Sequence, residues 1–203
     1  YILDHYKSDK PDNTTHSDPI VIEVGRLHLS NVHYKMDLAS RIGHQAPEHG
    51  VDIPCMEFKN ITARMKGIRV KGSEIDCRIV KFGTEEKSGF VLKDMSADVS
   101  VSPSHIVAKN MELQTNHSRL LVDAQLTYPD HWGMNPFCDI VTITADFRPG
   151  TIASMADAAY WAPVLWGMDE SFVVEGHVEG PVADMRVENF TASFQKSTSV
   201  CPF

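Results

Sequence analysis

Hydrophobic residues recur at every second position along much of the chain, which is the pattern of strands with one buried face. The alternating runs cover residues 20–24, 75–79, 120–128, 141–147 and 172–178. Turn residues separate them, as in Lys71-Gly72-Ser73 and Glu179-Gly180-Pro181. The pattern therefore predicts a mainly antiparallel, all-β protein.

A short unit recurs five times, each copy centred on an Asn or an Asp. Apolar or small residues stand four and two positions before the central residue, and one and three positions after it. The central residues are Asn31, Asn60, Asp94, Asn110 and Asn189. We interpret the unit as a repeated strand element with one apolar face.

The spacing within the unit is not that of a regular strand. From Phe58 to Ile61 the apolar positions are three apart, which would place Ile61 on the opposite face of a regular strand. A β-bulge restores the face by adding one residue, and Asn and Asp tolerate the left-handed backbone that such a site can need. A tight turn between two short strands would fit the same spacing.

This irregularity decides which side chains lie together. Val122, Ala124 and Leu126 share a face of the longest alternating run. Leu92, Met95, Ala97 and Val99 share a face only if the strand is irregular at Asp94. We expect both sets to contribute to one apolar surface, which would be a groove for lipid.

One segment departs from the strand pattern. Ile152, Met155, Ala156 and Ala159 follow helical spacing, with Thr151 as a possible N-cap and Pro163 as a terminator. We therefore predict a helix near 151–166. It either packs on the sheet or covers its end, or it forms a lid on an apolar groove with Trp161 and Trp166 near the mouth.

These observations predict a single elongated β-repeat domain over residues 19–195. Its curled sheet would have an apolar concave face and one short helix. Residues 1–18 are polar and are expected to form a flexible lead-in, and residues 196–203 a tail. The chain starts at Tyr1 and not at Met, so we expect it to be a processed or excised piece.

Composition excludes some classes of partner. The net charge is -8 and no basic stripe is visible, which argues against nucleic-acid binding. No apolar run approaches the roughly 20 residues that span a bilayer. The cysteines, Cys55, Cys77, Cys138 and Cys201, lack the CxxC spacing of a zinc site. The sequence does not show which of these cysteines pair in disulfides, or whether they remain buried or free thiols.

Candidate chemistry is sparse. His44 and His49 flank Glu48, but in a Pro-containing loop that fixes no shared face. His131 lies beside Trp132 without a nearby nucleophile motif, and no GxSxG, HExxH or phosphate-binding loop occurs. We therefore predict no enzymatic activity, no cofactor and no metal site.

Residues 85–128 resemble the TamB/AsmA-like envelope proteins of Bacteroidetes-type bacteria. The resemblance rests on a Ser88-Gly89-Phe90 strand, a strand leading into a "leucine-x-threonine-x-x-serine" turn at residues 113–118, and a strand ending in Tyr128. It extends more weakly over most of residues 20–195. These motifs are strand patterns and contain no catalytic residues.

The resemblance implies a function. Members of that family are long periplasmic proteins anchored in the inner membrane, associated with phospholipid transport to the outer membrane and with outer-membrane assembly. This chain would be one section, with phospholipid or another acyl-chain lipid and outer-membrane assembly proteins as expected partners. Two rival hypotheses are a surface β-sandwich that binds a protein or carbohydrate, and an enzyme with convergent carboxylates in a pocket.

Overall fold

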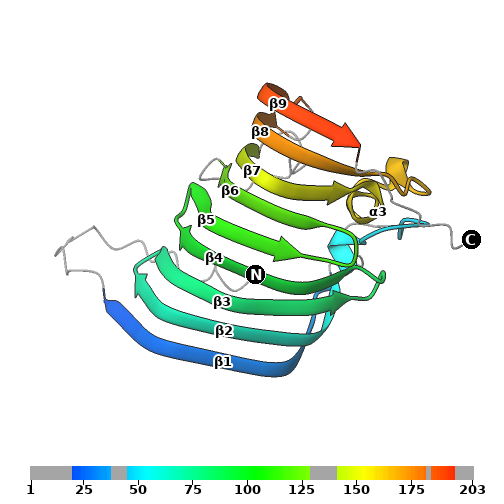
Figure 1. Cartoon of the computed structure of the whole chain (residues 1–203). Coiled ribbons are helices and arrows are strands. Elements are labelled where there is room, and N and C mark those ends of the chain that lie inside the picture. Colours follow the sequence, from blue (N-terminus) through cyan, green and yellow to red (C-terminus); the bar gives the residue numbers. More distant parts are fainter. Residues whose placement is uncertain (1–19, 38–44, 129–140, 182–183, 195–203) are drawn as a thin grey trace, which may run out of the picture.

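The computed structural model describes residues 20–37, 45–128, 141–181 and 184–194. They form one nine-stranded antiparallel sheet whose spatial order follows the chain order (Figure 1). The strands are β1 (Val21–Lys35), β2 (Glu57–Lys71), β3 (Glu74–Glu86), β4 (Val91–Val101), β5 (His105–Gln114), β6 (Arg119–Thr127), β7 (Thr142–Ser154), β8 (Ser171–Pro181) and β9 (Arg186–Phe194). The mainly antiparallel β fold predicted from the sequence is confirmed.

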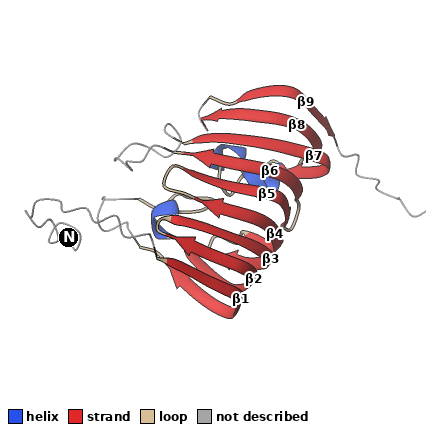
Figure 2. Cartoon of the chain, turned by 90° about the vertical axis from the view of Figure 1, so that its left-hand side faces the viewer, coloured by secondary structure: helices blue, strands red, loops and turns tan. Residues whose placement is uncertain are grey.

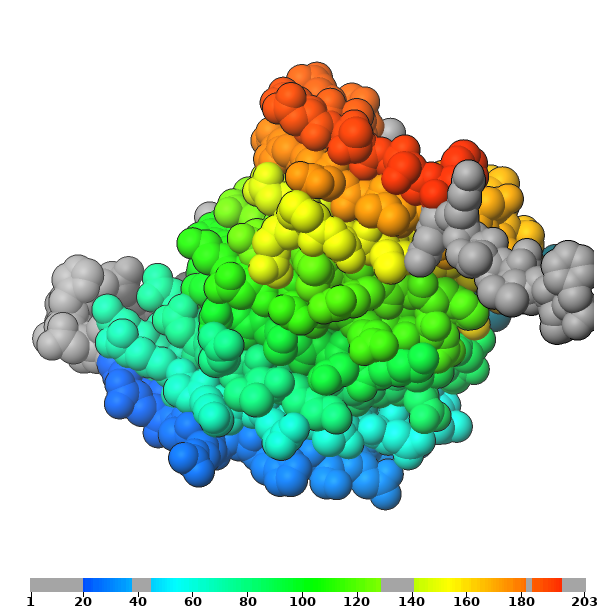
Figure 3. Space-filling view, viewed as in Figure 1, coloured from blue at the N-terminus to red at the C-terminus, as the bar shows by residue number. Residues whose placement is uncertain are grey.

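Each strand pairs with the strands that precede and follow it in the chain. The space-filling view shows the consequence, because the colours pass from blue to red without interruption across the molecule (Figure 3). Among the described residues there is one sheet and no second one packed against it. The β-sandwich considered above is therefore not the architecture of this part of the chain.

The sheet curls, and the helical segments lie on one side of it (Figure 2). They are the 3-10 helix η2 (Ile53–Cys55), the α-helix α3 (Met155–Ala158) and the 3-10 helix η3 (Pro163–Leu165). No described helix has the length and apolar composition needed to cross a membrane.

The strands are irregular at the centres of the repeated unit. Asn31, Asn60, Asn110 and Asn189 have φ values of 47° to 55°, the left-handed region that Asn tolerates better than most residues. Each of these four lies where the register of a neighbouring ladder shifts. The units are thus bulged strands and not pairs of short strands joined by turns.

Asp94 differs from the four asparagines. It also lies at a register shift, because Leu92 pairs with Thr84 while Met95, three residues on, pairs with Phe82, two residues back. However, Asp94 does not have positive φ. The bulge at this site is therefore built with ordinary backbone conformations.

A short helix lies within the range 151–166 predicted from the sequence, but it starts later than Thr151 and is shorter than that range. Thr151 to Ser154 continue β7, where Thr151 pairs with Val174 and Ser154 with Ser171. The α-helix is four residues long, and its N-cap is Ser154 in place of Thr151, since the Ser154 hydroxyl accepts a hydrogen bond from the Ala156 amide. Ladder hydrogen bonds to β8 outweigh the weak helix propensity of this segment. The expected lead-in (1–18) and tail (196–203) lie outside the described residues.

Candidate functional site

Apolar side chains line one face of the whole sheet. Directly paired residues project to the same side, so the ladders show which residues share a face. One row contains Ile22, Val70, Ile75, Val101, Ile106, Leu126 and Ile143. A second contains Leu29, Ala63, Phe82, Met95, Leu113 and Leu120. We call this side the apolar face.

The seven residues singled out from the sequence all project to this face. Leu92, Met95, Ala97 and Val99 pair with Thr84, Phe82, Ile79 and Cys77 of β3. Val122, Ala124 and Leu126 pair with Met111, Ala108 and Ile106 of β5. The two sets meet because Val99 pairs with Ala108, which pairs with Ala124. Their exposure differs: Leu92, Ala97 and Val122 are buried, and the other four are half-buried.

The opposite face is charged. A row across it contains Arg26, Lys66, Arg78, Asp98 and Lys109, and another contains Asp123, Asp146, His177 and Glu188. The Arg78 Nη1 donates hydrogen bonds to both carboxylate oxygens of Asp98, at 2.8 and 3.1 Å. A nine-stranded sheet with one apolar and one charged face is strongly amphipathic.

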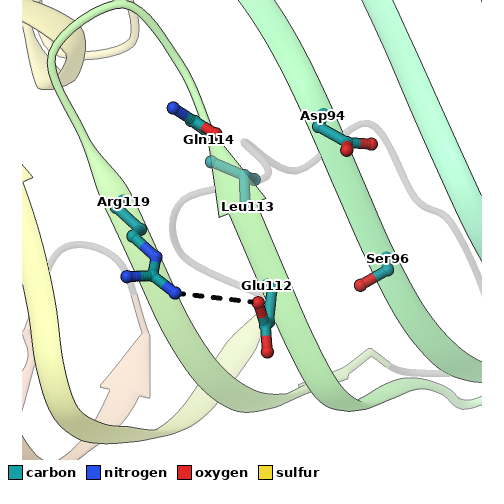
Figure 4. Close-up of a pocket in the computed structure, with 6 residues that line it drawn as sticks. All are labelled: Asp94, Ser96, Glu112, Leu113, Gln114 and Arg119. Atoms are coloured by element: carbon teal, nitrogen blue, oxygen red, sulfur yellow. Dashed lines mark ion pairs between the residues drawn. The ribbon is translucent and has the colours of Figure 1, made fainter.

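A polar depression on the charged face shows how successive side chains of a strand project to opposite faces (Figure 4). Glu112 and Arg119 lie there 4.0 Å apart, close to Asp94 and Ser96, while Leu113 lies on the other side of its strand. Asp94, Glu112 and Arg119 are exposed to solvent. Water therefore solvates these side chains.

On the apolar face, a cavity of about 610 Å³ lies where α3 meets one end of the strands from β1 to β7. Its walls come from the sheet and from the segment that contains α3. The lining residues are Tyr34, Phe58, Ile61, Phe82, Thr84, Phe90, Leu92, Leu113, Thr115, Ser118, Leu120, Ala153, Ser154, Asp157, Ala158 and Trp161. We call residues 155–166 the cap and this cavity the capped pocket.

Asp157 attaches the cap to the β5–β6 turn. Its carboxylate is buried and accepts hydrogen bonds from the hydroxyls of Thr115 and Ser118, the latter at 2.6 Å. The Ser118 hydroxyl in turn accepts from the Ser154 amide at 3.0 Å, at the start of α3. The Thr and Ser of the turn motif at residues 113–118 therefore position the cap.

A second loop supports the cap from the other side. The Val51 amide donates to the Tyr160 carbonyl at 2.7 Å, and the rings of His49 and Trp166 stack 4.5 Å apart. Gly50 allows this approach, because its φ is 87° and a Cβ there would lie 2.6 Å from the Tyr160 carbonyl oxygen. The cap is thus held by contacts with two loops, the β5–β6 turn and the loop that contains Gly50.

Aromatic rings close the pocket beneath the cap. Phe90, which directly precedes β4, makes edge-to-face contacts with Tyr160 and Trp161 at centroid distances of 5.7 and 5.4 Å. Trp161 lines the pocket and is 51% exposed, so it lies at the rim. Trp166 packs against Tyr160 and His49 and is not among the lining residues.

Cys77 belongs to the apolar face, where it pairs with Val99. Burial raises the pKa of its thiol, and the charge of Asp76 raises that pKa further. Cys77 and Cys55 are free thiols. A protonated, half-buried thiol is a weak nucleophile, so Cys77 acts as a small apolar side chain. Cys138 and Cys201 lie outside the described residues.

Of the histidines considered as ligands, His49 lies within the described residues. His49 stacks on Trp166 and lies 3.9 Å from Glu48, while His44 and His131 lie outside the described residues. Within the described ranges, no three His, Cys, Asp or Glu side chains are grouped to hold a metal ion.

Several site residues were not found from the sequence. The pocket takes Phe58, Phe82 and Leu113 from three strands, and strand alternation alone cannot show which of them meet. Asp157 gave no sequence signal apart from its place after Ser154. The Leu113–Ser118 motif was noted only as a resemblance, without a role.

No family model, no curated protein and no solved structure matches the chain. The function therefore has to be argued from the residues and their geometry.

Proposed function

We propose that this chain is a non-catalytic periplasmic segment of a TamB/AsmA-like envelope protein, and that its apolar face is a groove that carries phospholipid toward the outer membrane. The expected contribution to outer-membrane assembly, and the anchoring of the parent protein in the inner membrane, rest on the resemblance alone.

The continuous apolar face of an open sheet carries the proposal. Soluble proteins rarely leave a large contiguous apolar surface without a binding role. Here Ile22, Val24 and Tyr34 are exposed on β1, and most residues of the rows across the later strands are half-buried. Acyl chains on such a surface gain about 0.8 kcal/mol for each methylene removed from water.

Photo-crosslinking of the protein in the periplasm of a Gram-negative host tests the proposal. Val122 is only 3% exposed, so a probe there would disturb the fold. Leu113 is half-buried and lines the capped pocket, and its neighbour Glu112 projects to the charged face. A benzophenone residue at position 113 should give phospholipid adducts, and one at position 112 should not.

A substitution gives a second readout. Leu113→Glu places a carboxylate in the groove, where an unpaired charge is unfavourable by several kcal/mol. Co-purified lipid should fall strongly in this variant and not in Glu112→Gln. Equal adducts from both positions, or no adducts from either, would contradict the proposal.

A further inference from the structure

The buried hydroxyls of the capped pocket have partners within the protein. The Thr84 hydroxyl donates to the Lys59 carbonyl at 3.0 Å, and the Thr115 and Ser118 hydroxyls donate to Asp157. The Ser154 hydroxyl accepts from the Ala156 amide. The buried part of the lining therefore offers no unpaired hydroxyl to a ligand head group, while Tyr34 and Trp161 are exposed.

The charge of the pocket also excludes an anionic head group. Its lining contains no Lys, Arg or His, and its one charged side chain is Asp157. A phosphate or carboxylate entering the pocket would lose water without gaining a cation, and it would face a buried carboxylate. The hydrocarbon end of an amphiphile has no such cost.

The apolar face continues beyond the pocket. From Phe82 and Leu113 it extends along the strands to Ile75, Val101 and Ile106, near the turns at their other ends. An elongated apolar track that leads into an apolar pocket fits an extended chain better than a compact ligand.

From these observations we infer that the capped pocket receives the methyl end of an acyl chain, with the head group held away from the cap. This inference rests on the proposed function, because it assigns an orientation to a lipid bound in the groove. The cap is then a specificity element, because it sets how far a chain can enter.

Trp161 reports the orientation directly, since it lies at the pocket rim. In a protein carrying Trp132→Phe and Trp166→Phe, Trp161 is the remaining tryptophan of three. Radiolabelled phosphatidylglycerol with a nitroxide on acyl carbon 5 is bound to one sample, and the form with the nitroxide on carbon 16 to another. Scintillation counting measures the amount of lipid bound, and the loss of Trp161 fluorescence measures quenching by the nitroxide. We expect severalfold greater quenching by the carbon-16 label at equal occupancy.

The outcomes separate the two proposals. Binding with equal or stronger quenching by the carbon-5 label overturns the orientation and leaves the groove proposal standing. Absence of binding overturns the proposed function itself. Binding without quenching by either label shows that lipid occupies the groove outside the pocket, which also overturns the inference.

Filling the pocket gives an independent test. Ala153 lines it and Ala156 does not, and both are half-buried. Ala153→Phe should weaken binding of long-chain phosphatidylglycerol severalfold more than that of short-chain forms. Ala156→Phe should not change the chain-length preference. A preference unchanged in Ala153→Phe would contradict the inference, provided that circular dichroism shows an intact sheet.

Discussion

Asn60 stands in the middle of β2 with a φ of 55°, and its side chain is exposed. In a regular strand, Val at this position would be favourable and Gly unfavourable. In a left-handed conformation the order reverses, because a Cβ there costs about 1–2 kcal/mol. Asparagine therefore fits this position for conformational reasons.

We expect Asn60→Val to lower the free energy of unfolding by about 1–2 kcal/mol, and Asn60→Gly to change it by less than about 1 kcal/mol. Urea denaturation followed by circular dichroism measures both. A Val variant that is as stable as the parent, or a Gly variant that is the weaker of the two, would contradict the left-handed bulge.

His177 lies on the charged face beside two carboxylates. The hydrogen bond between its Nδ1 and Asp146, at 2.6 Å, is the main cause that raises the pKa of His177, and Glu179 and Glu188 add to it. The stability from this contact is fully present below the unfolded pKa, near 6.5, and is lost as pH rises through the higher folded value.

An NMR titration should therefore give His177 a midpoint above 6.5, and Asp146→Asn should lower it. The stability difference between the parent and His177→Gln should be largest at mildly acidic pH and vanish in alkaline solution. A midpoint that Asp146→Asn does not change would show that the contact does not form in solution.

At the scale of elements, the strands and their irregular sites could be predicted from the sequence, because both depend on local spacing. Phe58 and Ile61 are three apart on one face, and only an extra residue explains that. The short helix could be placed within 151–166, but its start and its length could not be predicted. Ile152, Met155 and Ala156 match helical spacing. However, Ile152 pairs with Val173 of β8, and this pairing holds it in a strand.

The cap depends on contacts between segments far apart in the chain. Asp157 meets Thr115 and Ser118, which are 42 and 39 residues away. Such a meeting follows from the sheet register and from the β7–β8 connection, and a single sequence defines neither. The capped pocket was therefore beyond sequence analysis, although the apolar face was not.

Asp157→Ala should loosen the cap without unfolding the sheet. It leaves the buried Ser118 hydroxyl without its acceptor, while the Thr115 hydroxyl keeps the Ser118 carbonyl at 3.3 Å, and the cost is about 1–3 kcal/mol. Hydrogen exchange should become faster in residues 155–166 and stay unchanged in β2 and β3. Asp169→Ala, an exposed residue of the same connection, is the matched control and should have no effect. Equal protection in both variants would show that Asp157 does not hold the cap.

At the scale of the molecule, β1 and β9 are the edges of the described sheet, and each pairs with one strand there. Ile22, Val24 and Val187 are exposed on these edges. Exposed apolar edge strands favour association between chains.

We therefore expect the isolated chain to self-associate, and Val24→Lys to reduce this, because a charge on the apolar side of an edge disfavours pairing. His28→Lys adds a lysine at the charged face of the same strand and should have a smaller effect. Sedimentation velocity measures both. Equal reduction in the two variants would point to net charge and not to the apolar edge.

Because every described strand neighbours only its predecessor and its successor in the chain, the order of the described strands contains no crossover that a change in strand number would disturb. Duplication of one hairpin in the gene would insert two strands and widen the sheet by about 9–10 Å, the width of two strand spacings. Loss of a hairpin would shorten it by the same step. Recombination can therefore change the width of the sheet in steps of one hairpin. Each hairpin keeps one apolar and one charged face when it is duplicated.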